Sequence, residues 1–455
     1  MEADSNRKRM DMKGYEEILL EFMEGGRKRF VIPVYQRNYD WELENCKQLY
    51  DDLVRMIRNN LRSHFFGCIV SQSNPDGNIN EILIIDGQQR LTTVSLLLLA
   101  IHDSIRDGVV IPQDDGLADT VYEDYLIVKR DPSRTKLKLK PIKSDENAFN
   151  GLFGISPDKV EDSTMTFNYN YFRNRISKGE VTVDELFRAV GQLQIINIGL
   201  GPDDSPQLIF ESLNSKGMSL SQGDLIRNYI LMDAPAQEQE RLYDRFWNPI
   251  EANTGYDVTA FMRYYLGVKT RQSPIEEKLY SAFKRFVEER PVTKDSLLQE
   301  MLDYSRRYGI LLRGGTKVPS VDGVIARLNR LDATVVRPFL LEVLRRCDDG
   351  ELTWDDVARI MMITEGYIFR RNICELPTNK LKNIFLNMDK DVVRLDGGSD
   401  RYIDKFMFIL LSKTDNSRFP DQIEFIDAFL NREVYRMNGR IKSYIFERLE
   451  NQGTR

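Results

Sequence analysis

The densest set of chemically useful side chains is the segment 86–90, Asp-Gly-Gln-Gln-Arg, which lies between two apolar runs. After an apolar strand, Gly87 lets the backbone turn tightly and approach a ligand closely. The first N–H groups of a following helix have no partner within that helix, and with the helix dipole they attract anions. Arg90 adds a bidentate phosphate donor, while Gln88 and Gln89 can orient water. The segment predicts an anion site, and a helix with a merely solvated first turn is the alternative.

Two threonines and a second polar segment extend this chemistry. Thr92 and Thr93 supply hydroxyls in the same first turn. Further along, Glu211 and Asn214 are three residues apart and would share one face of a helix. A carboxylate and an amide oxygen together suit Mg²⁺ that bridges nucleotide phosphates, and Lys216 could reach a phosphate from the end of that helix. Taken singly, such residues more often cap helices or lie at the surface, and this alternative stays open.

The segment 32–41, IPVYQRNYDW, interleaves aromatic and polar side chains. Aromatic rings can stack on bases or sugars while polar groups read base edges or contact the DNA backbone. The residues expected to make these contacts are Tyr35, Gln36, Arg37 and Asn38. The alternative is that Tyr39 and Trp41 belong to the core and that only Gln36 and Arg37 face a ligand.

The apolar pattern predicts the elements that must position these segments. Strands are expected at 65–71, 81–85, 135–140 and 193–200, and helices at 14–23, 42–60, 91–105, 166–178, 207–217 and 224–232. Lysine and leucine alternate over 135–140, which indicates a strand with a wet, basic face. Basic candidates for contacts with the DNA backbone are Arg27, Lys28, Arg29, Lys136, Lys138 and Lys140. The strand at 81–85 would run directly into segment 86–90, which would then open the next helix.

Length and pattern predict two domains. A chain of 455 residues is too long for one ordinary core. Helical patterns dominate from about residue 237 onward, so we expect one domain of strands and helices over 14–235 and a helical domain over 236–455.

Composition restricts the kind of protein and its chemistry. A net charge of -6 argues against a protein that coats DNA indiscriminately. The four cysteines lack CxxC spacing, which argues against a zinc site and a disulfide framework. No apolar run is long enough to cross a membrane, so a cytoplasmic protein without a membrane partner is expected. With His64 and His102 as its histidines, any hydrolysis must use carboxylates, amides, arginines and a metal.

Four motifs in this order resemble one family. IPVYQRNYDW, FFGCIV, IIDGQQRLTTVSLLL and FESLNSKGMSLSQGDLIRNYIL are similar to the N-terminal domain of GmrSD-type, modification-dependent restriction proteins over roughly residues 15–235. The resemblance implies an α+β, ParB/sulfiredoxin-like fold followed by a mostly α-helical domain. It also implies binding and hydrolysis of a nucleoside triphosphate, often GTP or UTP. In phosphorothioate-sensing members a pocket near the IPxYQR segment recognises modified DNA, and Tyr35, Gln36 and Arg37 are the matching positions here.

The resemblance also assigns roles to the polar segments. The DGQQR motif would form the phosphate site, in which Asp86, Gln88 and Arg90 act in catalysis, with further nucleotide contacts from Gly87, Gln89, Thr92, Thr93 and Lys216. Glu211 and Asn214 fall where ParB-type nucleotidases place their metal-binding Glu-Asn element, although the spacing differs. Family members commonly continue into an HNH nuclease domain, which needs a catalytic histidine. No histidine follows His102, so we expect DNA cleavage from a further HNH domain or subunit rather than from these residues.

The leading hypothesis is therefore a nucleoside triphosphatase that senses modified DNA and controls a nuclease domain or partner in restriction or anti-phage defence. Nucleoside triphosphate and Mg²⁺ are the expected ligands, DNA is the expected partner, and a homo-oligomer is left open. A non-catalytic nucleotide- or DNA-binding specificity subunit is the main alternative. A nuclease that uses the ParB-like fold itself is a third, which the few carboxylates near DGQQR disfavour.

Overall fold

The chain forms two compact units. The computed structural model describes residues 13–76, 79–129, 136–155, 162–201, 204, 206, 209, 220–232, 234–395, 398 and 400–451. Unit 1 comprises Met1–Ser219 and Leu231–Glu240, and unit 2 comprises Leu220–Ile230 and Arg241–Arg455. The division of the sequence into 14–235 and 236–455 stays a prediction.

A six-stranded mixed sheet is the scaffold of unit 1. Its strands are β1 (Lys13–Ile18), β2 (Lys28–Val31), β3 (His64–Asp76), β4 (Ile79–Asp86), β5 (Leu139–Lys140) and β6 (Leu193–Leu200). They lie in the order β1-β6-β3-β4-β2-β5. β3 and β4 pair antiparallel, whereas β6 joins β3, and β2 joins β4, in parallel.

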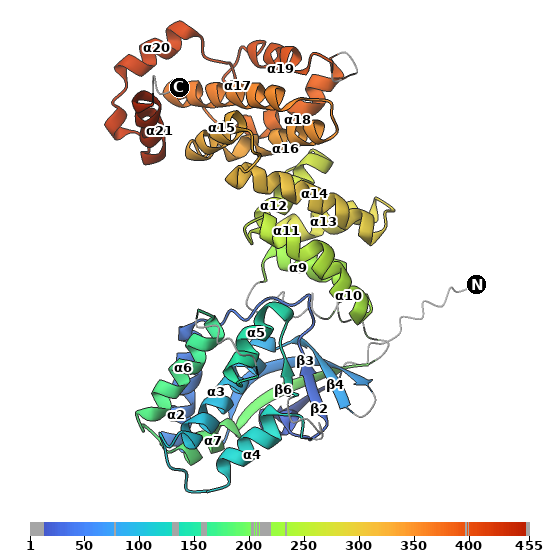
Figure 1. The fold of residues 1–455 in the computed structure, drawn as a ribbon, viewed down its shortest axis with the longest axis vertical. Helices are drawn as coiled ribbons and strands as arrows, with labels where there is room; N and C mark the ends of the chain where they lie inside the picture. Colours follow the sequence, from blue (N-terminus) through green and yellow to red (C-terminus); the bar gives the residue numbers. More distant parts are fainter. Residues whose placement is uncertain are drawn as a thin grey trace, which may run out of the picture. The chain divides into compact units, whose positions relative to one another are not determined.

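Helices of unit 1 gather on one side of this sheet (Figure 1). They are α1 (Leu19–Met23), α2 (Leu43–Arg58), α3 (Gln88–Arg106), α4 (Leu117–Val121), η1 (Tyr122–Leu126), α5 (Lys143–Leu152), α6 (Thr164–Ser177) and α7 (Val183–Val190). α3 is the central helix, because every residue from Leu91 to Ile101 is buried. Its first turn follows β4 directly, so the sheet and the core together fix the position of the DGQQR segment.

Most predicted elements of unit 1 are confirmed, but two predictions are wrong. The helix predicted at 14–23 is strand β1 up to Ile18 and a helix only from Leu19, because residues 13–18 pair with β6. A partner strand supplies hydrogen bonds that helical periodicity in the sequence does not reveal. The helix predicted to start at Leu91 is present but starts three residues earlier, at Gln88, so Gln88, Gln89 and Arg90 belong to it.

The wet, basic strand predicted at 135–140 is the second wrong prediction. The strand β5 has two residues, and Lys138 beside it is 1% exposed. Its ammonium donates to the backbone carbonyl of Asp124, and burial lowers its pKa to about 8. Lys138 is therefore a core lysine with a backbone partner and does not contact DNA from this position.

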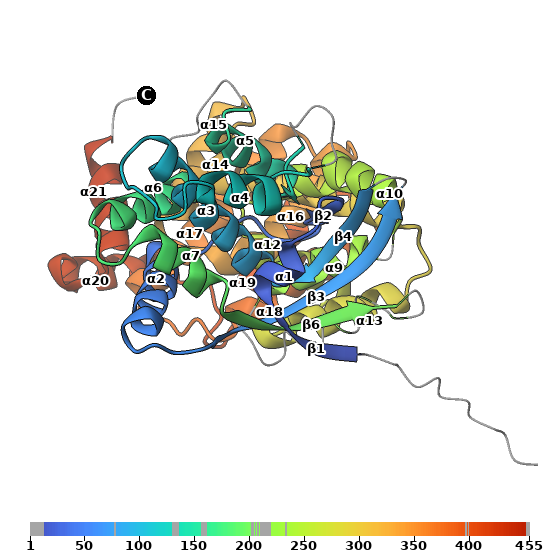
Figure 2. The same cartoon turned by 90° about the horizontal axis from the view of Figure 1, so that it is seen from below.

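Unit 2 is helical throughout its described part. It contains α9 (Gln222–Leu231), which ends one residue inside unit 1, η2 (Tyr243–Trp247), α11 (Asn248–Asn253), α12 (Val258–Thr270), η3 (Glu276–Lys278), α13 (Leu279–Glu288), α14 (Lys294–Arg313), α15 (Pro319–Arg330), η4 (Thr334–Val336), α16 (Arg337–Asp348), α17 (Trp354–Ile373), α18 (Leu381–Arg394), α19 (Tyr402–Leu411), α20 (Gln422–Asn431), η5 (Val434–Arg436) and α21 (Gly439–Glu450). Helix α10 (Ala236–Leu242) belongs to unit 1 up to Glu240 and to unit 2 from Arg241. Figure 2 gives a second view of both sets of elements. The α+β N-terminal fold followed by helices that the sequence predicted is confirmed, and no described helix is long and apolar enough to span a membrane.

The central position of α3 gives a stability prediction. Leu97 is fully buried in α3, so Leu97→Ala should lower the free energy of unfolding of this unit by about 3 kcal/mol through lost burial and a residual cavity. Urea denaturation followed by circular dichroism measures this change. Leu43→Ala, the same truncation at a half-exposed position of α2, should cost less than about 1 kcal/mol. Equal costs at the two positions would contradict the central role of α3.

Candidate functional site

The loop after β2 is bound to the start of α3 by two glutamine side chains. The Nε2 group of Gln88 donates to the carbonyl of Arg37 at 3.1 Å, and that of Gln89 donates to the carbonyl of Asn38 at 3.0 Å. The Oε1 atom of Gln89 accepts from the N–H of Asp40 at 3.1 Å. Both glutamines are buried. The two segments singled out in the sequence are therefore one assembly, in which DGQQR holds the backbone of the aromatic loop.

Tyr39 anchors the same loop inside unit 1. Its hydroxyl lies 2.7 Å from Oγ1 of Thr93 and accepts from Nδ2 of Asn168 at 3.0 Å. Asn168, which is itself buried, also donates to the carbonyl of Trp41 at 2.7 Å. Burial raises the pKa of the Tyr39 hydroxyl far above its usual range. Tyr39 is a core residue, as the alternative interpretation of this segment expected.

A partly buried carboxyl group completes the loop's attachments. Oδ2 of Asp145, in the first turn of α5, accepts from the N–H of Tyr39 at 2.7 Å, and the neighbouring Ser144 hydroxyl donates to Oδ1 of Asn38 at 3.0 Å. Burial raises the pKa of Asp145 to about 6; the nearby Asp40 carboxylate adds to the rise, and the Tyr39 N–H opposes it. The loop is thus held from α3, α5 and α6 at once.

Gly87 shapes the turn from β4 into α3. Gly87 is its N-cap residue with φ 93°, in the left-handed region that favours glycine, and no side chain caps the helix. A Cβ at this position would lie 2.9 Å from Cγ1 of Ile69 and 3.1 Å from the carbonyl oxygen of Cys68. The first turn contains no acidic residue. The backbone N–H groups of the first turn therefore have no side-chain cap among the described residues, and uncapped N–H groups at a helix start bind anions.

Arg90 lies flat on the backbone of β3. Its Nη1 group donates to the carbonyl of Cys68 at 3.1 Å. A Cβ at Gly67, whose φ is 121°, would lie 2.7 Å from Nε and 2.8 Å from Cζ of Arg90, so a larger residue would force the guanidinium to move. Within the described part of the chain this is the only side-chain hydrogen bond of Arg90. Its other N–H groups are therefore available to a phosphate.

Asp86 ends β4 immediately before Gly87. Its carboxylate is half-buried and makes no hydrogen bond or ion pair with the described residues. One carboxylate together with phosphate oxygens is a donor set that Mg²⁺ accepts. No group of three or more histidine, cysteine or acidic residues suited to a metal occurs among the described residues. The predicted metal ligands Glu211 and Asn214, and the predicted phosphate contact Lys216, lie outside the described residues.

Several predicted contact residues lie deeper than the sequence suggested. Tyr35 and Gln36 are buried, and Nε2 of Gln36 donates to the carbonyl of Ile85 at 2.7 Å. Thr93 is fully buried against Tyr39, and this placement disfavours its expected role as a nucleotide contact. Thr92 is buried as well, and its hydroxyl has no hydrogen-bond partner among the described residues.

The remaining residues of the loop face outward. Arg37 is partly exposed, and its Nη1 group forms an ion pair with Asp40 at 2.7 Å. Asn38 is exposed. Of the four residues predicted to contact DNA, these two have side chains that a ligand can reach.

Comparison with protein families supports the assignment drawn from the motifs. Residues 19–231 match the model of the GmrSD restriction endonuclease, N-terminal domain. This part of the chain belongs to the GmrSD N-terminal family. No curated protein gave a significant match. The matched range contains the aromatic loop, the DGQQR segment and all of β6, and residues 19–231 are therefore a restriction-related domain.

Four residues that support the GmrSD site were not identified as site residues from the sequence: Gly67, Ser144, Asp145 and Asn168. A lone glycine inside an apolar strand often marks a close approach of another group, so Gly67 carried a usable signal. The other three lie more than a hundred residues from the loop in sequence. Only the fold brings Ser144, Asp145 and Asn168 close to the aromatic loop.

The raised pKa of Asp145 predicts a pH dependence of stability. The folded GmrSD domain holds this proton up to about pH 6, whereas the unfolded chain releases it near pH 3.9. The folded state therefore binds more protons between these values, and its contribution to stability falls as pH rises through this window. Asp145→Asn, which keeps an acceptor for Tyr39, should flatten this slope. At pH 7 it should raise the free energy of unfolding by about 1 kcal/mol, a value reduced because the carboxyl is partly solvated.

Urea denaturation at a series of pH values checks this prediction. The exposed Asp115 offers a matched control, since Asp115→Asn should keep the slope of the wild type between about pH 4 and pH 6. A profile of Asp145→Asn that runs parallel to the wild type would show that Asp145 does not titrate in this window.

Proposed function

We propose that the start of α3 binds a nucleoside triphosphate with Mg²⁺ and promotes its hydrolysis, as the sensor component of a modification-dependent restriction system. The observation that carries the proposal is the uncapped first turn of α3, which begins on Gly87 in the left-handed conformation. Arg90 beside it has unused N–H donors, and the carboxylate of Asp86 has no partner among the described residues. Positive N–H groups, a guanidinium and a carboxylate for Mg²⁺ together match a triphosphate. The family resemblance favours GTP or UTP.

Hydrolysis in this proposal uses a water molecule aligned with the terminal phosphorus. The water oxygen forms a bond to that phosphorus, the bond to the bridging oxygen breaks, and the products are a nucleoside diphosphate and inorganic phosphate. Asp86 or the free Oε1 atom of Gln88 orients the water, since the Nε2 group of Gln88 is already bound to Arg37. Arg90 stabilises the charge that develops on the phosphate oxygens. Mg²⁺, where bound, would be held by Asp86 and would neutralise phosphate charge.

In this proposal, the side chains of Arg37 and Asn38 contact modified DNA. Their side chains are accessible, and their carbonyls accept hydrogen bonds from Gln88 and Gln89. A change in the loop on DNA binding would therefore reach the first turn of α3 through these two amides. A nuclease domain or partner of the HNH type would then cut the DNA.

Loss of the free carboxylate should stop turnover. Asp86→Asn is expected to lower the rate of phosphate release at least about a hundredfold while nucleotide binding persists, because the N–H groups and Arg90 remain. Malachite-green detection of phosphate measures the rate, and a thermal-shift series with the four triphosphates and Mg²⁺ measures binding. Asp107→Asn, at the opposite end of α3, is the matched control and should behave as wild type.

The outcomes separate the two candidate functions. Nucleotide binding without phosphate release in the wild type would leave a non-catalytic specificity subunit as the function. Equal release rates for wild type and Asp86→Asn would remove the assigned role of Asp86. No stabilisation by any triphosphate would remove the nucleotide site itself.

Coupling between the loop and α3 predicts a second phenotype. Gln89→Met keeps the side-chain length but removes the hydrogen bonds to Asn38 and Asp40. We expect modified DNA to stimulate phosphate release no further above the basal rate of this variant, and a cost of about 2 kcal/mol in stability. Gln194→Met at a half-buried position of β6 is the control and should retain the stimulation. Full stimulation of Gln89→Met by modified DNA would exclude this route of coupling.

A further inference from the structure

Helix α20 in unit 2 is apolar on a side that nothing in its unit covers. None of its residues is buried. Ile423, Ile426 and Leu430 are 83%, 45% and 77% exposed, respectively. With Asp427 they follow the spacing i, i+3, i+4 and i+7, so these four residues form one stripe along the helix, here named the outer stripe. A solvent-exposed stripe of this kind is a mark of an interaction surface.

The other side of α20 lines a groove of about 860 Å³. Phe425 and Phe429 form one wall of this groove, and residues of α15, α17 and α21 line the remainder. Phe369 and Tyr444 belong to the same ring cluster. Figure 1 shows α20 and α21 next to α17. The helix is therefore apolar on both sides, and such helices are normally covered on both.

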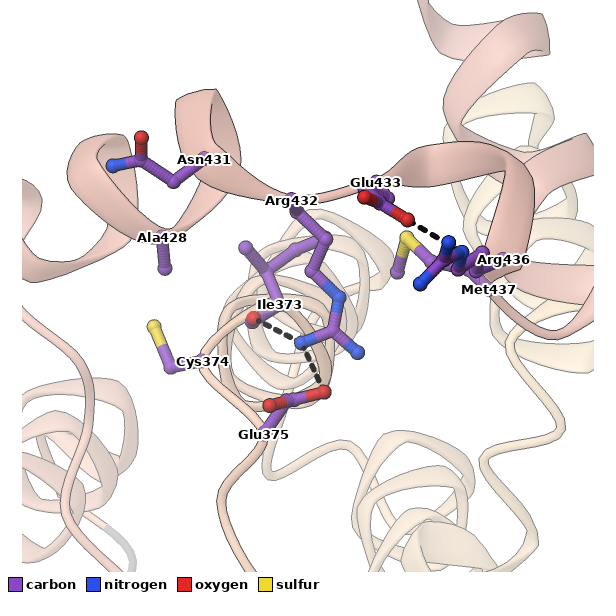
Figure 3. Close-up of a pocket in the computed structure, with 9 residues that line it drawn as sticks. All are labelled: Ile373, Cys374, Glu375, Ala428, Asn431, Arg432, Glu433, Arg436 and Met437. Carbon is purple, nitrogen blue, oxygen red and sulfur yellow. Dashed lines mark hydrogen bonds and ion pairs between the residues drawn. The ribbon is translucent and has the colours of Figure 1, made fainter.

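Polar contacts, rather than burial, fix the position of α20. Near its start, Gln422 accepts from Arg370 at 2.6 Å and Glu424 pairs with Arg418 at 2.5 Å. Just past its end, Arg432 donates to the carbonyl of Ile373 at 3.0 Å and pairs with Glu375 at 2.8 Å (Figure 3). The outer stripe is thus presented on a tethered helix.

The groove and the outer stripe carry opposite charges. Arg448 at the edge of the groove is exposed and has no ion-pair partner among the described residues. Beside it, Met362 and Leu449 are 45% and 54% exposed apolar residues. The outer stripe offers apolar side chains and one carboxylate, Asp427, whose partner in the described chain is the neutral amide of Asn431 at 3.1 Å. The same chain therefore presents both halves of a complementary contact.

We propose that a second copy of this chain covers this surface. The outer stripe of one copy docks at the groove of the other, with Asp427 of the first copy paired with Arg448 of the second. Covering the stripe and the exposed edge of the groove would bury on the order of 800 Å² per copy, the size of a standard stable interface. Pairing of stripe with stripe is disfavoured because it would bring two Asp427 carboxylates together, whereas the groove offers an arginine.

The oligomeric state of the full chain tests the proposal. Sedimentation velocity over a wide range of concentrations should show a dimer for the wild type. Ile423→Ser and Leu430→Ser should each raise the dimer dissociation constant at least about tenfold, because each removes apolar area from the interface. Ile275→Ser, which changes another exposed isoleucine of unit 2, should leave the constant unchanged.

A charge exchange identifies the pairing. Asp427→Arg and Arg448→Asp should each weaken the dimer about tenfold, and the double variant should restore most of the affinity. Unchanged circular dichroism would show that these surface variants fold. A monomeric wild type, or a dimer that the stripe variants leave intact, would overturn the proposal. A double variant as weak as the sum of its parts would overturn the pairing of Asp427 with Arg448.

Discussion

The hydrogen bonds from the side-chain amides of Gln88 and Gln89 to the backbone of residues 37–40 are the constraint on which the site depends. A buried backbone carbonyl or N–H without a partner is costly, so a loop that packs on α3 needs donors and acceptors from that helix. An amide side chain supplies both at once. This requirement explains two consecutive glutamines at the start of a helix whose middle is mostly apolar.

Because of this constraint, different groups of DGQQR bind the loop and the ligand. The glutamine amides are occupied by the loop, whereas the groups left for a ligand are the backbone N–H groups after Gly87, the guanidinium of Arg90 and the carboxylate of Asp86. Two glycines make these groups available: Gly87 lets the chain turn against β3, and Gly67 leaves room for Arg90. The Tyr39, Thr93 and Asn168 network holds the loop from beneath and makes the assembly rigid. Rigid positioning is what recognition of a charged ligand requires.

Unit 2 follows a different principle, because its helices are placed mostly by the burial of apolar and aromatic side chains. Buried ion pairs add specific contacts, such as Arg346 with Asp389 and Arg327 with Glu365. Helix α20 is the exception, since none of its residues is buried and the apolar residues of its outer stripe remain exposed. An exposed apolar stripe lowers solubility unless a partner covers it, so its presence is informative about assembly.

The sequence by itself determined the order of elements, the helical second half and the local chemistry of DGQQR, because periodicity and glycine placement are local signals. It also determined the family, through motifs whose order is specific. Only the tertiary structure decided that residues 13–18 are a strand, that Lys138, Tyr35, Gln36 and Thr93 are buried, and that Asp145 and Asn168 belong to the site. Each of these depends on a partner far away in the chain, and the side-chain type alone does not reveal whether such a partner exists.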